Sequence, residues 1–172
     1  MFRLIGVLLL MTGSIGAGWS VKERLKRNLE DLYRMKQILH MLQNEIEYSR
    51  APLPEACARV GNRVPEPYRS AFFSIRREML VNDGRPFWEI WSRKMEECMK
   101  ELSVAREDKR NFLDFGNCIG FMDGKMQAGA VGQYMHKLDI SIGRMEKEMA
   151  DKCKVIMSLS IMGGLMLVII LL

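Results

Sequence analysis

The stretch Leu32–Ile46 has the sequence LYRMKQILHMLQNEI and decides the fold class. Its apolar residues recur at steps of three, four, three and four: Leu32, Met35, Leu39, Leu42 and Ile46. This is the period of an amphipathic helix that buries one side. We predict that the helix continues to Ser49 and ends before Pro52, because proline lacks an N–H and restricts the residue before it.

The remainder of the central sequence repeats this helical period, and no run alternates as a strand would. The predicted helices are Pro54–Val60, about Glu66–Leu80, one through Trp88–Leu102, Val104–Ile119 and about Asp123–Asp151. Gly61 and Asn62 suit the C-terminal cap of the first of these. The sequence therefore predicts an all-α protein, a helical bundle of about six helices between N- and C-terminal transmembrane helices.

The predicted transmembrane helices are the two ends of the chain. Residues 4–21 and 155–172 are each uncharged for 18 residues, which as a helix spans roughly 27 Å, close to the hydrocarbon core of a bilayer. We predict anchors at 1–21 and 155–172, with a helical domain at 22–154 between them. The alternative for the N-terminal stretch is a cleaved signal peptide, which would place the domain outside the cytoplasm.

Basic residues crowd the inner edges of both ends. They are Lys22, Arg24, Lys26 and Arg27 on one side and Lys147, Lys152 and Lys154 on the other. Positive charge favours the cytoplasmic side, so we expect the domain in the cytoplasm, beside anionic lipid, and both termini outside. The formal net charge of +5 is too mild and too mixed with acidic residues to predict nucleic-acid binding.

Nothing in the sequence predicts catalysis or a cofactor. The four cysteines, Cys57, Cys98, Cys118 and Cys153, form no Cys-x-x-Cys pair, and with only two histidines a zinc site is not expected. We interpret the cysteines as reduced, buried residues of a cytoplasmic domain. No phosphate-binding loop, nucleophile motif or carboxylate pair is present, so we expect no enzyme, no metal and no small-molecule substrate.

The most distinctive stretch runs from Leu42 to Ala56, where a helix ends and a proline restarts the chain. One interpretation is a tight corner in which the Tyr48 hydroxyl and Glu45 or Glu55 bind free backbone groups. The other is a docking surface for another subunit. Asp123 before Gly124 allows the same two interpretations, a helix cap or a contact with a cation or partner.

This stretch resembles the stage III sporulation protein AB family of endospore-forming bacteria. The likeness lies in Leu42, Glu45, Ile46, Tyr48, Pro52, Leu53, Glu55 and Ala56, and in a second block of Phe115 to Gly120, Asp123 and Gln127. The Leu-Ile-Gly start and the hydrophobic tail also match, and the likeness departs at residues 64–85. The candidate contact residues are therefore Glu45, Tyr48, Pro52, Leu53, Glu55, Asp123 and Gln127.

The resemblance implies a specific role. The family is similar to the F-type inner-membrane platform protein of type II secretion systems, whose cytoplasmic domains are small helical bundles. It implies a non-enzymatic platform or scaffold subunit of a complex between mother cell and forespore, in the mother-cell outer forespore membrane. The expected partners are other membrane subunits of that complex, a secretion-type ATPase and membrane lipids.

The alternative function is a small oligomeric pore or transport component. Small residues in both ends, such as Ser14 and Gly18 four apart, would let such helices approach closely. However, the two ends contain only four hydroxyl side chains, Thr12, Ser14, Ser158 and Ser160, and no charge. A water-filled path therefore has little support from their sequence.

Overall fold

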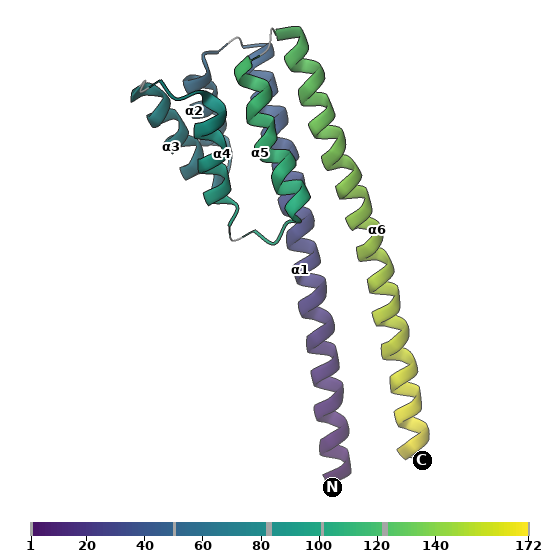
Figure 1. Ribbon diagram of the computed structural model, residues 1–172. Coiled ribbons are helices and arrows are strands. Elements are labelled where there is room, and N and C mark those ends of the chain that lie inside the picture. The colour runs from purple at the N-terminus through teal and green to yellow at the C-terminus, as the bar shows by residue number, and fades with distance from the viewer. Residues whose placement is uncertain (1, 50, 82–83, 101, 122–123, 172) are drawn as a thin grey trace. The chain divides into compact units, whose positions relative to one another are not determined.

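The computed structural model describes residues 2–49, 51–81, 84–100, 102–121 and 124–171. Side chains are described within 22–119, with the same gaps, within 132–156, and at Ser158, Leu159, Met162, Gly163 and Met166. The described residues form six α-helices and no strand: α1 Phe2–Glu47, α2 Leu53–Arg63, α3 Tyr68–Val81, α4 Phe87–Cys98, α5 Arg106–Phe121 and α6 Gly124–Leu171 (Figure 1). The predicted all-α helical bundle is confirmed.

The first and last helices of the predicted bundle run on into the terminal segments of the chain without a break. Each terminal segment belongs to the same helix as the sequence that adjoins it, because α1 and α6 run for 46 and 48 residues. Neither contains a proline, so nothing removes a backbone donor along them. Among the residues that the structure describes, none of the helices combines the length and apolar content that a membrane crossing requires.

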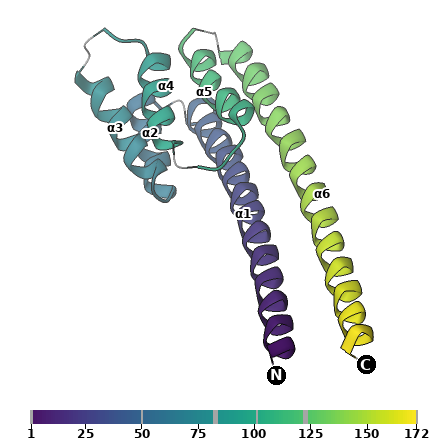
Figure 2. The same ribbon diagram turned by 60° about the horizontal axis from the view of Figure 1, so that its bottom comes forward.

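The chain forms two compact units. Residues 30–142 make one, and the two terminal parts of the chain make the other. Inside the 30–142 unit, α2 packs against α3, α3 against α4, and α4 against α5. Figures 1 and 2 both show α4 between α3 and α5, which leaves α3 on the outer side of this unit. The predicted domain limits at residues 22 and 154 stay a prediction.

Trp91 lies at the centre of the core of the 30–142 unit and is fully buried. Its ring has four aromatic neighbours with centroids 5.4 to 5.9 Å away: Phe72, Phe87, Phe112 and Phe115. Its indole Nε1–H donates to the backbone carbonyl of Phe112 at 3.2 Å, so the one polar atom of the side chain is satisfied.

The apolar row of α1 is confirmed at four of its five positions: Leu32, Met35, Leu39 and Leu42 are buried, whereas Ile46 is half-buried. The predicted cap at Gly61 and Asn62 is wrong, because both residues lie inside α2, which ends at Arg63. Gly61 is buried, and a Cβ there would lie 3.1 Å from the Cβ of Phe72. The glycine therefore serves close packing of α2 on α3 rather than the end of a helix.

Candidate functional site

The corner between α1 and α2 is the site that the sequence singled out. The backbone satisfies itself there: the Ala51 N–H donates to the Glu45 carbonyl at 3.2 Å. The N–H groups of Glu55 and Ala56 both donate to the Pro52 carbonyl at 2.9 Å. Among the described residues these bonds link the backbone across the turn, and Glu45 and Glu55 bind Arg59 instead of free backbone groups. The expected backbone contact of the Tyr48 hydroxyl stays a prediction.

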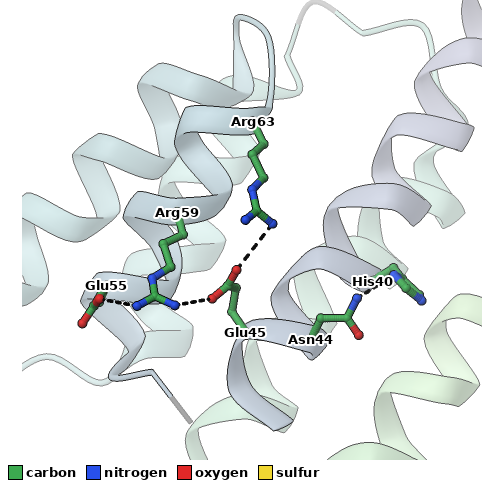
Figure 3. Close-up of polar contacts among 6 residues, drawn as sticks. All are labelled: His40, Asn44, Glu45, Glu55, Arg59 and Arg63. Carbon is green, nitrogen blue, oxygen red and sulfur yellow. Dashed lines mark hydrogen bonds and ion pairs between the residues drawn. The ribbon is translucent and has the colours of Figure 1, made fainter. Parts of the chain in front are cut away.

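Glu45 instead holds two arginines of α2 (Figure 3). Its carboxylate is buried, with 5% of the residue exposed. Arg59 Nη1 donates to Oε2 at 3.1 Å, and Arg63 Nη1 lies 3.5 Å from Oε1. A carboxylate removed from water keeps its charge at low cost only when cations replace the water, so Glu45 ties the end of α1 to the outer face of α2.

Arg59 also bridges to a second carboxylate. Its Nη2 donates to Glu55 Oε1 at 2.6 Å, one turn earlier on α2. The hydrogen bonds to Glu55 and then to Glu45 raise the pKa of the Arg59 guanidinium. One fully charged guanidinium therefore joins two carboxylates from different helices, which is an arrangement that fixes geometry and has no proton to transfer near neutral pH.

The other predicted contact residues divide by exposure. Tyr48 is 81% exposed and Pro52, the N-cap residue of α2, is exposed as well. Leu53, the first residue of α2, is half-buried. Asp123 lies outside the described residues, and Gln127 lies in α6 with its side chain outside them. The structure thus brings Glu45 and Glu55 together through Arg59 and leaves Tyr48 and Pro52 on the surface.

The two arginines of this site were missed in the sequence. Arg59 follows Glu55 by four residues, and Arg63 follows Arg59 by four, so both lie on one face of a helix. That spacing was a usable signal. The spacing does not identify Glu45 as a partner, because the arginines meet Glu45 only once α2 has folded back against α1.

A second charged cluster surrounds Glu78 on α3. Its Oε1 lies 2.9 Å from Lys94 Nζ, and its Oε2 lies 3.3 Å from Arg85 Nη1 and also binds Arg93. The hydrogen bond from Lys94, and beyond it the charges of Lys94, Arg93 and Arg85, lower the pKa of the Glu78 carboxyl. This cluster joins α3 to α4 and to the segment before α4.

Polar pairs also join the part of α6 that belongs to the 30–142 unit to its neighbours. The Ser141 hydroxyl donates to the buried Asp108 Oδ1 of α5 at 2.6 Å. Lys36 Nζ of α1 donates to Asp139 Oδ1 at 2.5 Å. Two bonds two residues apart on α6 thus reach two different helices, which sets the rotation of α6 about its axis.

A shallow groove of about 540 Å³ lies between α3 and α4 and contains Cys98. Burial raises the pKa of the Cys98 thiol to about 12, so at neutral pH it is an inert thiol rather than a nucleophile. All four cysteines are free; Cys57 is buried as predicted, whereas Cys98, Cys118 and Cys153 are only half-buried. The described residues hold no group of three or more side chains suited to a metal ion.

The fold and its sites define an all-α helical-bundle protein whose charged clusters join helices to one another. Residues 3–172 match the family Stage III sporulation protein AB. The chain is 22% identical to the Stage III sporulation protein AB of Bacillus subtilis (strain 168) over 171 residues, 99% of each chain. A solved structure of Stage III sporulation protein AB (SpoIIIAB) has the same fold, with a TM-score of 0.66 at 17% identity, covering 72% of this chain and 97% of that chain.

This protein therefore belongs to the stage III sporulation protein AB family, which makes it a sporulation protein.

Proposed function

We propose that this chain is a non-enzymatic, membrane-anchored scaffold subunit of a secretion-like complex that links mother cell and forespore. Family membership supports the sporulation part of this role. The resemblance to the F-type platform protein supports the scaffold part. The charged clusters support it as well, because each binds one helix to another and none presents a reactive group.

One observation carries the anchoring. Val155, Leu159, Met162 and Met166 are exposed and follow one another on α6 at steps of four, three and four. They lie in the uncharged segment 155–172. An apolar row of this kind costs about 25 cal/mol for each Å² left in water, and the lipid phase removes that cost.

In the proposed arrangement both ends of the chain are held in the membrane, with the 30–142 unit on the cytoplasmic side in the mother cell. Its partners are other membrane subunits of the complex and a secretion-type ATPase. At the corner between α1 and α2, the exposed Tyr48 is the candidate partner contact, whereas the buried Glu45 serves the corner itself.

Topology tests the anchoring. In a chain with Cys98, Cys118 and Cys153 replaced by serine, we introduce Tyr48→Cys and treat membrane vesicles of both orientations with a membrane-impermeant maleimide. We expect labelling in inside-out vesicles and none in right-side-out vesicles until detergent is added. Cys57 serves as the control, since it is buried and should react only after denaturation.

The opposite pattern of labelling would place the domain outside the cytoplasm, as a cleaved signal peptide would. Recovery of the chain in the high-speed supernatant without detergent would rule out anchoring altogether. Either result would end the proposal in its present form.

Partner binding tests the scaffold role. Tyr48→Ala in the full chain should reduce co-purification of the other complex members from sporulating cells several-fold, because an exposed aromatic side chain is lost. Its melting temperature should not change, since the side chain is mostly in solvent. Unchanged co-purification would remove Tyr48 from the contact surface, and a lowered melting temperature would assign it to the corner.

A further inference from the structure

The outward side of α3 has a composition unlike that of a solvated helix face. Apart from Ser70, the exposed residues of α3 are Arg69, Phe73, Arg76, Arg77, Leu80 and Val81, and we call these six the α3 outer face. Leu80 and Val81 are 62% and 70% exposed, and Phe73 is 37% exposed. Arginine and aromatic side chains are enriched in protein interfaces and in their energetic centres.

The order of the residues along this face is regular. Arg69, Phe73, Arg76 and Leu80 follow one another at steps of four, three and four, so they form one row along the helix axis. A cation and an apolar side chain therefore alternate about every turn of α3. Arg77 and Val81 repeat the same pair one position to the side.

The positive charge of this face is not balanced within the described part of the chain. No described carboxylate pairs with Arg69, Arg76 or Arg77. The single acidic residue of α3, Glu78, is turned to Lys94 and the arginines beside it. A partner that brings carboxylates would therefore meet three cations that have no described competing ion pair.

The inner side of the same helix already forms the core. Tyr68, Ala71, Phe72 and Ile75 are buried there, and the α3 outer face takes no part in that packing except at the edge of Phe73. In both views α3 lies on the outer side of the 30–142 unit (Figures 1 and 2). Within the 30–142 unit, the described residues therefore leave this face exposed.

We propose that the α3 outer face binds an acidic amphipathic helix of a partner protein, one that presents aspartate or glutamate about one turn from aliphatic side chains. Carboxylates would accept bidentate hydrogen bonds from Arg69 and Arg76. Aliphatic groups would cover Phe73 and Leu80. The spacing of the row matches the i, i+4 and i, i+7 positions of a helix laid along α3.

The alternation favours a protein helix over a lipid surface. A helix that lies in a membrane interface keeps its apolar residues together on the side that enters the lipid, with cations at the flanks. Here Arg76 stands between Phe73 and Leu80 on one row. Sinking the two apolar side chains would carry that guanidinium toward the hydrocarbon, whereas a facing carboxylate pairs with it.

The experiment is site-specific cross-linking of the full chain in sporulating cells. Phe73→p-benzoylphenylalanine and, separately, Leu80→p-benzoylphenylalanine are irradiated, and the cross-linked segment of the adduct is sequenced by mass spectrometry. We expect both positions to reach the same segment of one protein, with acidic and aliphatic residues in alternation at helical spacing. This inference rests on the proposed scaffold function, because that function is the reason for seeking the partner in sporulating cells.

Charge reversal provides the matched comparison. Arg76→Glu with Arg77→Glu should lower the yield of the Leu80 adduct at least tenfold. Arg106→Glu with Arg110→Glu, a second pair of exposed arginines on α5, should leave the yield unchanged. Both double variants should melt within a few degrees of the parent chain, which shows that folding is intact.

An adduct with lipid, with a second copy of this chain, or with a segment that lacks acidic residues would overturn the proposal, as would the absence of any adduct. An adduct yield that survives the reversal of Arg76 and Arg77 would overturn it too. Membrane fractionation of the same cells reports separately on the proposed anchoring, so failure of the one is not mistaken for failure of the other.

Discussion

Glu45 is a charged residue at the end of an apolar row. The helical period places it beside Leu42 and Ile46, toward the interior, where a lone carboxylate would be costly. Arg59 and Arg63 offset that cost, and because both arginines are partly exposed, the cluster does not bury three ions fully. The turn of α2 that carries Arg59 and Arg63 therefore decides whether Glu45 stabilises or destabilises the corner.

Replacing Glu45 by glutamine should destabilise the 30–142 unit by about 1.5–3 kcal/mol, the usual worth of hydrogen bonds to a charged group. Arg59 and Arg63 would keep their positive charges and lose the carboxylate of Glu45 that binds both of them. Chemical denaturation followed by circular dichroism measures the loss. Glu55→Gln is the control and should cost less than about 0.5 kcal/mol, because its ion pair lies on the surface of α2.

Tyr68, unlike Glu45, buries a polar group that has no hydrogen-bond partner among the described residues. Its ring is fully buried, and its hydroxyl has no hydrogen-bond partner among the described residues. Burial raises the pKa of this phenol, with smaller contributions from Cys98 and Asp31, so the hydroxyl stays protonated. A buried donor without an acceptor is a cost that the surrounding aromatic packing offsets.

We expect Tyr68→Phe to stabilise the unit by about 1 kcal/mol, since it removes the unsatisfied group and keeps the ring. Thermal melting detects this as a rise of a few degrees. The exposed Tyr48→Phe should leave the melting temperature unchanged. A fall in melting temperature for Tyr68→Phe would show that the hydroxyl is bound after all.

At the scale of the elements, the packing of neighbouring helices depends on glycines that allow close approach and on ion pairs that join one helix to another. Gly116 on α5 faces Trp91 on α4 so closely that a Cβ would lie 2.4 Å from the indole Cδ1. No side chain fits in that space. The contact between α4 and α5 therefore depends on the absence of a side chain at this position.

Gly116→Ala should cost at least about 1–3 kcal/mol, the usual penalty for overpacking a core. Gly132→Ala is its matched control on α6, where nothing lies within 4 Å of the added Cβ. That change should stabilise by about 0.5–1 kcal/mol through helix propensity alone. Denaturant midpoints measure both, and equal effects of the two substitutions would contradict the packing seen at Trp91.

The Glu78 cluster gives the contact between α3 and α4 a dependence on pH. The pKa of the Glu78 carboxyl in the folded chain lies below the ordinary value of 4.5, and the hydrogen bond from Lys94 is the largest cause. Its contribution is therefore complete above about pH 4.5 and is lost as the pH falls through the lower, folded value. Glu78→Gln should lower the melting temperature at pH 7 and have progressively less effect toward pH 3.

Asp31 provides a control of opposite sign. Burial raises its pKa in the folded chain above the ordinary value of 3.8, so its ionised form weakens folding near neutral pH. Asp31→Asn should raise the melting temperature at pH 7, and this gain should fade as the pH falls and the wild-type carboxyl is protonated. If both substitutions shifted stability in the same direction at pH 7, the assignment of causes would be wrong.

At the scale of the whole molecule, the proposed membrane location depends on the apolar ends of the chain. In the proposed arrangement the row from Val155 to Met166 on α6 lies in lipid. A lysine at the centre of a membrane helix costs about 2.5–3.5 kcal/mol on insertion scales. Cations placed in this row should therefore weaken the membrane association of the full chain without touching the 30–142 unit.

Leu159→Lys with Met162→Lys should shift the chain from the membrane pellet toward the supernatant in carbonate extraction. Ile140→Lys with Gly143→Lys places the same two charges three residues apart at exposed positions on the same helix, outside the uncharged segment. This control should remain in the pellet. Equal behaviour of the two double variants would contradict a membrane role for the row.

The sequence by itself determined the all-α class, the helices to within a few residues and the buried row of α1, because these follow from local period and from proline. Only the tertiary structure decided the partners of Glu45 and Glu78, the function of Gly61 and Gly116, and the exposure of Tyr48. Each of these depends on which helix lies opposite, and residues far apart in the chain carry no local signal of their neighbour. The spacing of apolar residues shows which side of a helix is buried, whereas only the packing of helices in the structure shows which residues that side contacts.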